Sequence, residues 1–547
     1  MACTTHEVTN QVPELGDYNL YLSDPALQEA VRREGAHWRH VSLAAYGARM
    51  GLAQTRQWAH DANRCGPELE AFDRCGHRVD RVHFHPDWHR FMRMAFLQGM
   101  HASAWADPKP GAQAARAAAY LLHGQIEAGS LCPVTMTSAA IPVLRKEPLF
   151  DALSAKLYSL HYDERDLPIS DKAGMMIGMG MTEKQGGSDL RSNTTQATPV
   201  GVGGRGAQYA LRGHKWFFSS PMSDAHLVLA RHDDRLSCFF VPRWLDDGRK
   251  NSVQIQRLKN KMGNRSNASA EVEFNDASAI LVGEEGRGIA TLIEMASCTR
   301  LDCILGSAAL LRQAVVQALH HARHRRAFGR ALIEQSLMRS VLLDLVVESE
   351  AATVLAMRLA RAYDASDDPL DWGYRRILTP AAKFWICKRA IEAVGECMEV
   401  WGGNGYIEDG PMARLYREAP VNSIWEGSGN VMCLDVLRAL KNEPELGQAF
   451  IATLVRDSVD EPLLADSANS LLLLLHDKQM NIESAGRYVA QELVLLVQAN
   501  LLRRHAPQAL ADLFIQTRFG GRGGRVFGVL GSETHAVGLF DRAWHQQ

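Results

Sequence analysis

Several features that would indicate a secreted, membrane-spanning or thiolate-metal protein are missing from this sequence. The first residues show neither a basic segment nor a following apolar stretch, so we expect no secretory signal. The longest aliphatic run, Leu471 to Leu475, is too short to cross a bilayer. The ten cysteines include no Cys-x-x-Cys pair, which argues against a disulfide framework and a thiolate metal site. A cytoplasmic protein with reduced thiols and no membrane partner is therefore expected.

A large excess of charge is missing as well. The formal net charge is −2, so the whole chain has no electrostatic attraction to nucleic acid, and any such attraction must be local. The chain is 46% hydrophobic and 22% charged, which is typical of a folded globular protein. Its 547 residues are too many for one hydrophobic core, so several domains are expected.

Changes of hydrophobic period divide the chain into four predicted domains. Residues 1–177 carry helical periodicity, whereas 178–285 hold short β-like runs between turns and predict a compact antiparallel β-barrel domain. The helical period returns over 286–440, which predicts a helical bundle, and 441–547 is a further helical segment. The predicted fold class is therefore mostly α with a central β domain.

Two groups of histidines resemble metal ligands only superficially. His83, His85 and His89 stand in a segment with helix-like neighbours, where residues two apart do not point the same way. His320 and His324 are four apart on one predicted helix face without an acidic partner between them, which favours a pair at the surface. We predict no metal site.

The most informative stretch surrounds Glu426. The apolar residues Ile424 and Trp425 precede this carboxylate, and the turn-forming residues 427–430 follow it. A carboxylate against an aromatic wall loses solvation, which raises its pKa and suits it to act as a general base. The backbone N–H groups of the turn could hold a phosphate. An ordinary turn with a solvated glutamate is the alternative.

Two further stretches suit a phosphorylated cofactor. The loop 178–189 is rich in small residues, and Thr182 and Ser188 could donate hydrogen bonds to a flavin or phosphate. It lacks the third glycine of the dinucleotide fingerprint, and a plain entry loop to the β domain is the alternative. The cations in 323–330 end a predicted helix, which any helix C-terminus favours, and they would also suit a pyrophosphate.

The C-terminal segment carries a local positive charge. Between positions 503 and 525 five arginines face one acid, Asp512. Glycines and one aromatic residue stand among the last three arginines, which suits phosphate contacts and stacking on bases. A solvated loop with paired arginines is the alternative. The predicted DNA-binding residues are Arg503, Arg504, Arg518, Arg522 and Arg525.

In combination, these fragments resemble the successive flavin and catalytic motifs of acyl-CoA dehydrogenases. The fragments are 179–189, 213–219, 325–329, 401–406 and 424–428, and the resemblance covers about residues 120 to 440. Within that superfamily the chain resembles the AidB group of adaptive-response proteins. That closer resemblance rests on 19–24, 129–137, 263–269, 420–430 and the additional C-terminal segment.

The resemblance implies an acyl-CoA dehydrogenase fold with an extra C-terminal helical domain. It also implies a homotetramer, built as a dimer of dimers, with FAD at the dimer seam. Glu426 would be the catalytic base. The implied FAD-binding residues are Met179, Gly180, Met181, Thr182, Gly187, Ser188, Phe217, Phe218, Ser219, Ile424, Trp425, Ser428, Gly429 and Asn430, with Arg325 and Phe328 contributed by the neighbouring subunit.

Two positions depart from the pattern of that family. Glu399 stands where a glutamine usually precedes the Gly-Gly turn, and Ser336 stands where a glutamine usually follows the Arg-x-x-Phe-Gly motif. Both fall on the part of the site that binds adenine across the dimer.

The implied chemistry is removal of the α-proton of an acyl thioester by Glu426, with hydride transfer to the flavin. The AidB resemblance implies a flavoprotein that binds double-stranded DNA largely without sequence preference and shields or repairs it after alkylation. Weak, isovaleryl-CoA-like dehydrogenase activity would accompany that role. An ordinary dehydrogenase of a short or branched acyl-CoA is the alternative.

Overall fold

The computed structural model describes residues 5–364, 367–477, 479–521, 526–530 and 536–545. Its contacts form two compact units. The helical unit contains Met1–Arg56, Gln113–Ile126 and Cys303–Gln547, and the barrel unit contains Gln57–Ala112 and Glu127–Asp302. The predicted domain 1–177 therefore contributes to both units, because its helices pack against two different cores.

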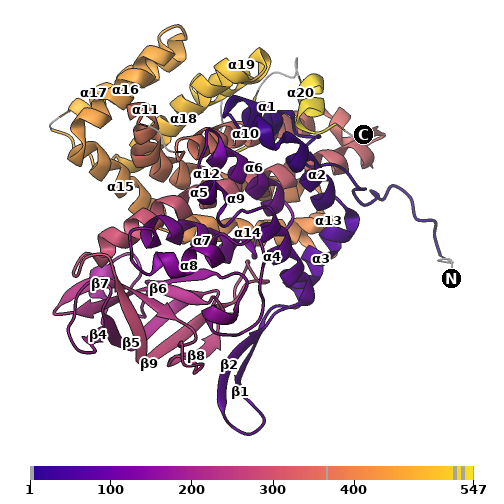
Figure 1. Ribbon diagram of the computed structural model, residues 1–547. Coiled ribbons are helices and arrows are strands. Elements are labelled where there is room, and N and C mark those ends of the chain that lie inside the picture. Colours follow the sequence, from indigo (N-terminus) through magenta and orange to yellow (C-terminus); the bar gives the residue numbers. More distant parts are fainter. Residues whose placement is uncertain (1–4, 365–366, 478, 522–525, 531–535, 546–547) are drawn as a thin grey trace. The chain divides into compact units, whose positions relative to one another are not determined.

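The barrel unit is built around a seven-stranded sheet (Figure 1). Its strands are β3 (Ile177–Gly180), β4 (Gln196–Pro199), β5 (Gln208–Ser219), β6 (Ala225–His232), β7 (Arg235–Pro242), β8 (Val253–Leu258) and β9 (Ser269–Val282). Pairings β6–β7, β7–β9, β9–β5, β5–β4 and β4–β6 close the sheet on itself. The expectation of a purely antiparallel sheet is wrong, since β3 and β4 each pair with β6 in parallel.

The same unit contains an antiparallel hairpin that the sequence reading missed. Strands β1 (Glu68–Phe72) and β2 (Arg78–His83) lie within the segment predicted to be helical. His83 Nε2 lies 2.8 Å from a Glu70 carboxylate oxygen, while His89 Nδ1 lies 2.9 Å from the Tyr162 hydroxyl, so these histidines have separate partners. The helices of the unit are α4 (Pro86–Leu97), α5 (Ser103–Ala106), α7 (Leu131–Leu144) and α8 (Phe150–Leu157).

The helical unit holds the remaining helices. They are α1 (Pro25–Arg33), α2 (His40–Met50), α6 (Ala112–Gly124), α10 (Ser336–Arg361), α11 (Pro369–Gly373), α12 (Thr379–Val400), α13 (Gly403–Tyr406), α14 (Pro411–Ile424), α15 (Gly429–Asn442), α16 (Pro444–Ser458), α17 (Pro462–His476), α18 (Gly486–His505), α19 (Gln508–Arg518) and α20 (Ala536–Ala543). The boundary between the units falls within α3 (Ala53–Arg64) and α9 (Gly288–His324). Every residue of α18 from Glu492 to Leu502 is buried, so α18 is a core helix.

Helix α9 is also a core helix. By length and composition alone it could cross a membrane, but 94% of its most apolar window is buried. His320, on this helix, is 3% exposed and its Nε2 lies 2.8 Å from the Pro13 carbonyl oxygen. The expectation that His320 and His324 form a surface pair is therefore wrong for His320, because the N-terminal segment covers it.

Ion pairs tie both ends of the chain to the bundle within the helical unit. Arg312 of α9 pairs with Asp24 at 3.0 Å, and both side chains are buried. Arg542 of α20 lies 2.6 Å from Glu29 of α1 and 2.8 Å from Glu350 of α10. Arg542 and Glu350 are largely buried, so the cation that Glu29 and Glu350 share fixes α1, α10 and α20 against one another.

Candidate active site

The predicted catalytic turn connects α14 to α15 in the helical unit. Helix α14 ends at Ile424, and Trp425 adopts an extended conformation that caps it. Glu426 has φ of 58° and Gly427 has φ of 102°. The left-handed region is unfavourable for a residue with a Cβ, by roughly 1 kcal/mol. Such a conformation at a glutamate, where glycine or asparagine would be relaxed, is typical of a functional position.

A buried lysine of α12 holds this turn. Lys383 is 1% exposed, and its Nζ donates a hydrogen bond of 2.7 Å to the Trp425 carbonyl and another to the Gly427 carbonyl. These two carbonyls belong to the peptide groups that flank the pair Glu426–Gly427, one before Glu426 and one after Gly427. Since the Trp425 carbonyl shares its peptide with the Glu426 N–H, the ammonium also polarises that N–H as a donor.

The start of α15 forms the second half of the turn. Its N-cap, Ser428, makes no side-chain hydrogen bond to the helix, so the first N–H groups of α15 keep their capacity to bind an anion. Asn430 is exposed, and its Oδ1 accepts a 2.9 Å hydrogen bond from Arg487 of α18. Burial raises the pKa of Cys433 on α15 to about 11, whereas the charges of Arg487 and Lys388 oppose the shift. Two cations therefore lie near the beginning of this helix.

In the barrel unit, a buried ion pair fixes the predicted flavin loop. Lys215 Nζ lies 2.7 Å from Glu183 Oε1, and both side chains are fully buried. Burial alone would raise the pKa of Glu183, but Lys215 and backbone N–H groups lower it to about 2. Glu183 accepts hydrogen bonds from the N–H groups of Thr194 (2.7 Å) and Thr195 (3.2 Å). The carboxylate thus connects the beginning of the loop to the segment that follows it.

The glycines of this loop leave room beside its polar groups. A Cβ on Gly187 would lie 2.8 Å from Thr182 Oγ1, so glycine at this position keeps the hydroxyl accessible. Gly187 and Ser188 are exposed, and Thr182 and Met181 are half-buried. Met179 and Gly180 belong to strand β3. A shallow surface of small and hydroxylated residues fits one side of a planar cofactor.

The three predicted residues of β5 divide between the surface and the core. Phe217 is 51% exposed and has Lys259 Nζ 4.7 Å from its ring centroid. Phe218 is 1% exposed in the barrel core, stacked on His226 at 3.8 Å. The expectation that Phe218 packs on a flavin is therefore wrong, since alternation along the strand points it inward. Ser219 Oγ lies 3.3 Å from Ser269 Oγ.

The predicted adenine-binding residues lie on a short hairpin of the helical unit, formed by β10 (Arg326–Ala327) and β11 (Arg330–Ala331). Phe328 at its tip has φ of 51° and is 97% exposed. Arg325, half-buried, donates a hydrogen bond to the Asn10 carbonyl. An aromatic ring held out in solvent suits contact with a second chain.

The C-terminal arginines differ in their surroundings. Arg518 pairs with Asp344 and Glu348 of α10, both at 2.7 Å, and its side chain is 11% exposed. These contacts assign Arg518 to the packing of the helical unit, which corrects its predicted role in binding DNA. Arg504 is 50% exposed and pairs with Asp457 at 2.7 Å, and Arg503 donates to the Asp457 carbonyl at 3.3 Å. Arg522 and Arg525 lie outside the described residues.

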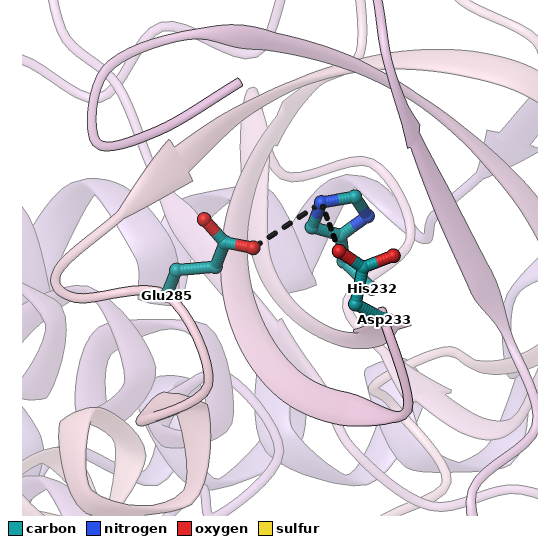
Figure 2. A group of neighbouring side chains, drawn as sticks. All are labelled: His232, Asp233 and Glu285. Carbon is teal, nitrogen blue, oxygen red and sulfur yellow. Dashed lines mark ion pairs between the residues drawn. The ribbon is translucent and has the colours of Figure 1, made fainter.

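One group of side chains in the barrel unit resembles a metal site (Figure 2). His232 Nε2 lies 3.2 Å from Glu285 Oε1 and 3.7 Å from Asp233 Oδ2. Arg235 lies 3.9 Å from the same Glu285 oxygen, and Asp233 is exposed. A cation would compete with the arginine for Glu285, so ion pairing accounts for this group without a metal.

Three family models match the chain in succession. They are "Adaptive response protein AidB N-terminal domain" over 10–164, "Acyl-CoA dehydrogenase, middle domain" over 178–277, and "Acyl-CoA dehydrogenase, C-terminal domain" over 286–441. A relative from Escherichia coli (strain K12), "Putative acyl-CoA dehydrogenase AidB", is 47% identical over 95% of both chains. The chain belongs to the AidB group of the acyl-CoA dehydrogenase family. This confirms the predicted family, and with it the FAD-dependent oxidoreductase class.

Solved structures of related proteins confirm the fold of the AidB-group chain. ACDH-11 of Caenorhabditis elegans in complex with C11-CoA has a TM-score of 0.83 and 26% identity, with 94% of this chain and 93% of that chain covered. An acyl-CoA dehydrogenase from Bacillus anthracis complexed with FAD has a TM-score of 0.68 over 98% and 99% of the two chains. At 14% identity the latter supports the fold alone.

Lys383 is the residue of this site that sequence reasoning missed. It lies 43 positions before Glu426, in a helix that reads as an ordinary apolar stripe. A lysine among buried alanines and aromatics of α12 is the signal that could have revealed it, because a buried ammonium requires acceptors. The departures Glu399 and Ser336 are both exposed in the helical unit.

Proposed function

We propose that this AidB-group protein oxidises an acyl-CoA thioester between its α- and β-carbons, with Glu426 as the base. The observation that carries the proposal is the left-handed backbone of Glu426, held by Lys383 through the Trp425 and Gly427 carbonyls. The Glu426 carboxylate would take the α-proton, and the Glu426 N–H would donate to the thioester carbonyl oxygen. The polarised peptide would strengthen that second interaction.

The residues that would hold FAD are those with hydroxyl or backbone N–H groups that can bind its ring, phosphates and ribityl chain. Thr182, Gly187 and Ser188 would face the ring and its phosphates, and the N–H groups at the start of α15 would bind a phosphate or ribityl oxygen. Arg325 and Phe328 would hold the adenine half of a neighbouring subunit's cofactor. When bound, FAD accepts the hydride that leaves the β-carbon.

The visible spectrum of the purified protein tests this proposal. We expect a yellow protein whose flavin absorbance bleaches under anaerobic conditions when isovaleryl-CoA or another short branched acyl-CoA is added. A series of straight acyl chains then ranks the substrates. A yellow protein that no acyl-CoA bleaches would contradict the proposed oxidation.

As a second function, we propose that the protein binds double-stranded DNA and limits alkylation damage. The AidB relationship and the local charge of the C-terminal segment favour it. With Arg518 buried in ion pairs, the candidates are Arg503, Arg504, Arg522 and Arg525. Binding of this kind is non-specific and falls steeply with salt.

Charge reversal in the full-length protein tests the DNA proposal. Arg522→Glu combined with Arg525→Glu should weaken duplex binding at low salt. It should also reduce the slope of log affinity against log salt concentration by the equivalent of about two phosphate contacts. Arg438→Glu combined with Arg456→Glu, on exposed surfaces of α15 and α16, reverses the same number of charges and is the matched control. Duplex binding by the double variant that equals wild type would contradict the proposed role of these arginines.

We also propose a homotetramer in the cytoplasm. The Phe328 ring, 97% exposed at the tip of its hairpin, is available to a second chain and supports self-association, because aromatic residues are enriched at protein interfaces.

A further inference from the structure

The helical unit contains a cavity that shares no residue with the Glu426 turn. Its volume is about 200 Å³, and it opens where α1, α10, α11, α16 and α18 meet. The charged and aromatic residues of its lining are Arg33, Glu34, Arg358, Tyr374, Phe450, Asp457, Arg504 and His505. Ligand pockets commonly start at about 300 Å³, so this cavity suits a molecule of few heavy atoms.

Two arginines of this cavity have unused hydrogen-bonding capacity. Arg33 Nη2 and Arg358 Nη1 are buried atoms for which the described residues provide no acceptor. One other nitrogen of each arginine is engaged in an ion pair: Arg33 Nε lies 2.7 Å from Glu34, and Arg358 Nη2 lies 2.8 Å from Asp371. A buried guanidinium N–H without an acceptor is unfavourable, so both atoms call for an oxygen-bearing ligand.

Three arginines and two acids, Glu34 and Asp457, line the cavity, and this net positive charge favours negative charge on that ligand. Burial of the ring, together with the charges of Arg33 and Arg504, lowers the pKa of His505 to about 4. His505 is therefore neutral at neutral pH. The positive charges of Arg33 and Arg504 that act on its ring would also attract an anion bound beside them.

One wall of the cavity is aromatic and tightly packed. The Arg358 guanidinium lies 4.0 Å from the Tyr374 ring centroid, and the rings of Tyr374 and Phe450 meet edge to face at 5.7 Å. A Cβ on Gly373 would lie 2.6 Å from Phe450, so glycine permits this packing. Tyr374 opens a π-helical turn, Tyr374–Leu378, between α11 and α12. Such turns recur at functional sites.

We propose that this cavity, the Arg33–Arg358 pocket, binds a small organic anion. Its carboxylate or phosphate accepts hydrogen bonds from Arg33 Nη2 and Arg358 Nη1, and its flat apolar body lies against Tyr374 and Phe450. Because α16 and α18 belong to the C-terminal segment and α10 and α11 to the bundle, the bound anion stabilises the contact between those parts of the helical unit.

Calorimetric titration of the full-length, flavin-loaded protein tests this site. The probes are benzoate, phenyl phosphate, inorganic phosphate and the neutral isostere benzamide. We expect benzoate or phenyl phosphate to bind at least about tenfold more tightly than benzamide, because benzamide lacks the charge. Inorganic phosphate alone should bind more weakly than phenyl phosphate, because it lacks the ring.

Variants of one helix locate the binding. Arg358→Gln should weaken benzoate binding about tenfold or more, whereas Arg361→Gln, one turn along α10 and paired with Asp364, should leave it unchanged. If Arg358→Gln fails to fold, benzoate binding by Arg33→Gln tests the same pocket independently. An unaltered flavin spectrum shows that a variant is folded. The proposal would be overturned by any of three results: equal affinity for benzoate and benzamide, equal weakening of benzoate binding by both α10 variants, or no binding of any probe.

Discussion

Replacement of Lys383 by methionine removes the group that holds the catalytic turn and keeps most of the side-chain volume. The variant loses two hydrogen bonds from an ammonium to the Trp425 and Gly427 carbonyls. Each is worth about 1.5–3 kcal/mol in a buried site, and relief of the buried charge offsets part of this. We expect the free energy of unfolding to fall by about 2–4 kcal/mol.

The same change should slow flavin reduction more than it weakens substrate binding. Without the ammonium, the Glu426 N–H is a poorer donor and the turn is free to relax from its left-handed conformation. Displacement of a reacting group by about 1 Å costs on the order of a hundredfold in rate, so a decrease of about 10- to 100-fold is expected. Anaerobic stopped-flow bleaching over a range of acyl-CoA concentrations separates the limiting rate from the dissociation constant.

Lys441→Met, at the exposed end of α15, is the control for the loss of a lysine. It should reduce neither stability nor the limiting rate appreciably. A Lys383→Met protein that is as stable as wild type and bleaches at the wild-type rate would refute the role assigned to this lysine.

Three further predictions concern other contacts. As pH falls from about 4.5 to about 2, Glu183 should account for about 3 kcal/mol of the stability that wild type loses in urea unfolding, since its pKa is lowered in the folded state, and the loss in Glu183→Gln should be smaller by that amount. Arg518→Met should lower stability by about 3–5 kcal/mol because it removes the cation that Asp344 and Glu348 share and leaves Glu348 with Arg389, and unchanged thermal unfolding would argue against a structural role. Phe328→Asp should shift the protein to smaller assemblies in size-exclusion chromatography with light scattering, whereas an unchanged mass would contradict an interface at this hairpin.

The sequence predicted those parts of the site that are short and contiguous. The turn around Glu426 and the loop 178–189 carry their glycines and hydroxyls within a few residues, so local pattern reveals them. Lys383 reaches its acceptors only after α12 and α14 have packed, and no local pattern contains that information. The pairing of Arg518 with α10 depends in the same way on the packing of segments 170 residues and more apart.

Errors in the fold prediction have physical causes too. Phe217 and Phe218 are adjacent and chemically alike, and only the register of β5 decides which ring enters the barrel core. The hairpin β1–β2 was missed because its strands are short and rich in charged residues, and because β2 has no apolar alternation. His320 is buried by the N-terminal segment around Pro13, a contact between residues more than 300 positions apart.

The proposed oxidation requires the Glu426 carboxylate to take the α-proton of a thioester. Anaerobic mixing of flavin-loaded Glu426→Gln with the acyl-CoA that bleaches wild type tests it most directly, with Glu445→Gln on exposed α16 surface as control. We expect Glu426→Gln to keep its yellow cofactor and to bind the thioester still, while its flavin reduction falls by at least about a hundredfold. Reduction of the Glu426→Gln flavin at the wild-type rate would contradict it.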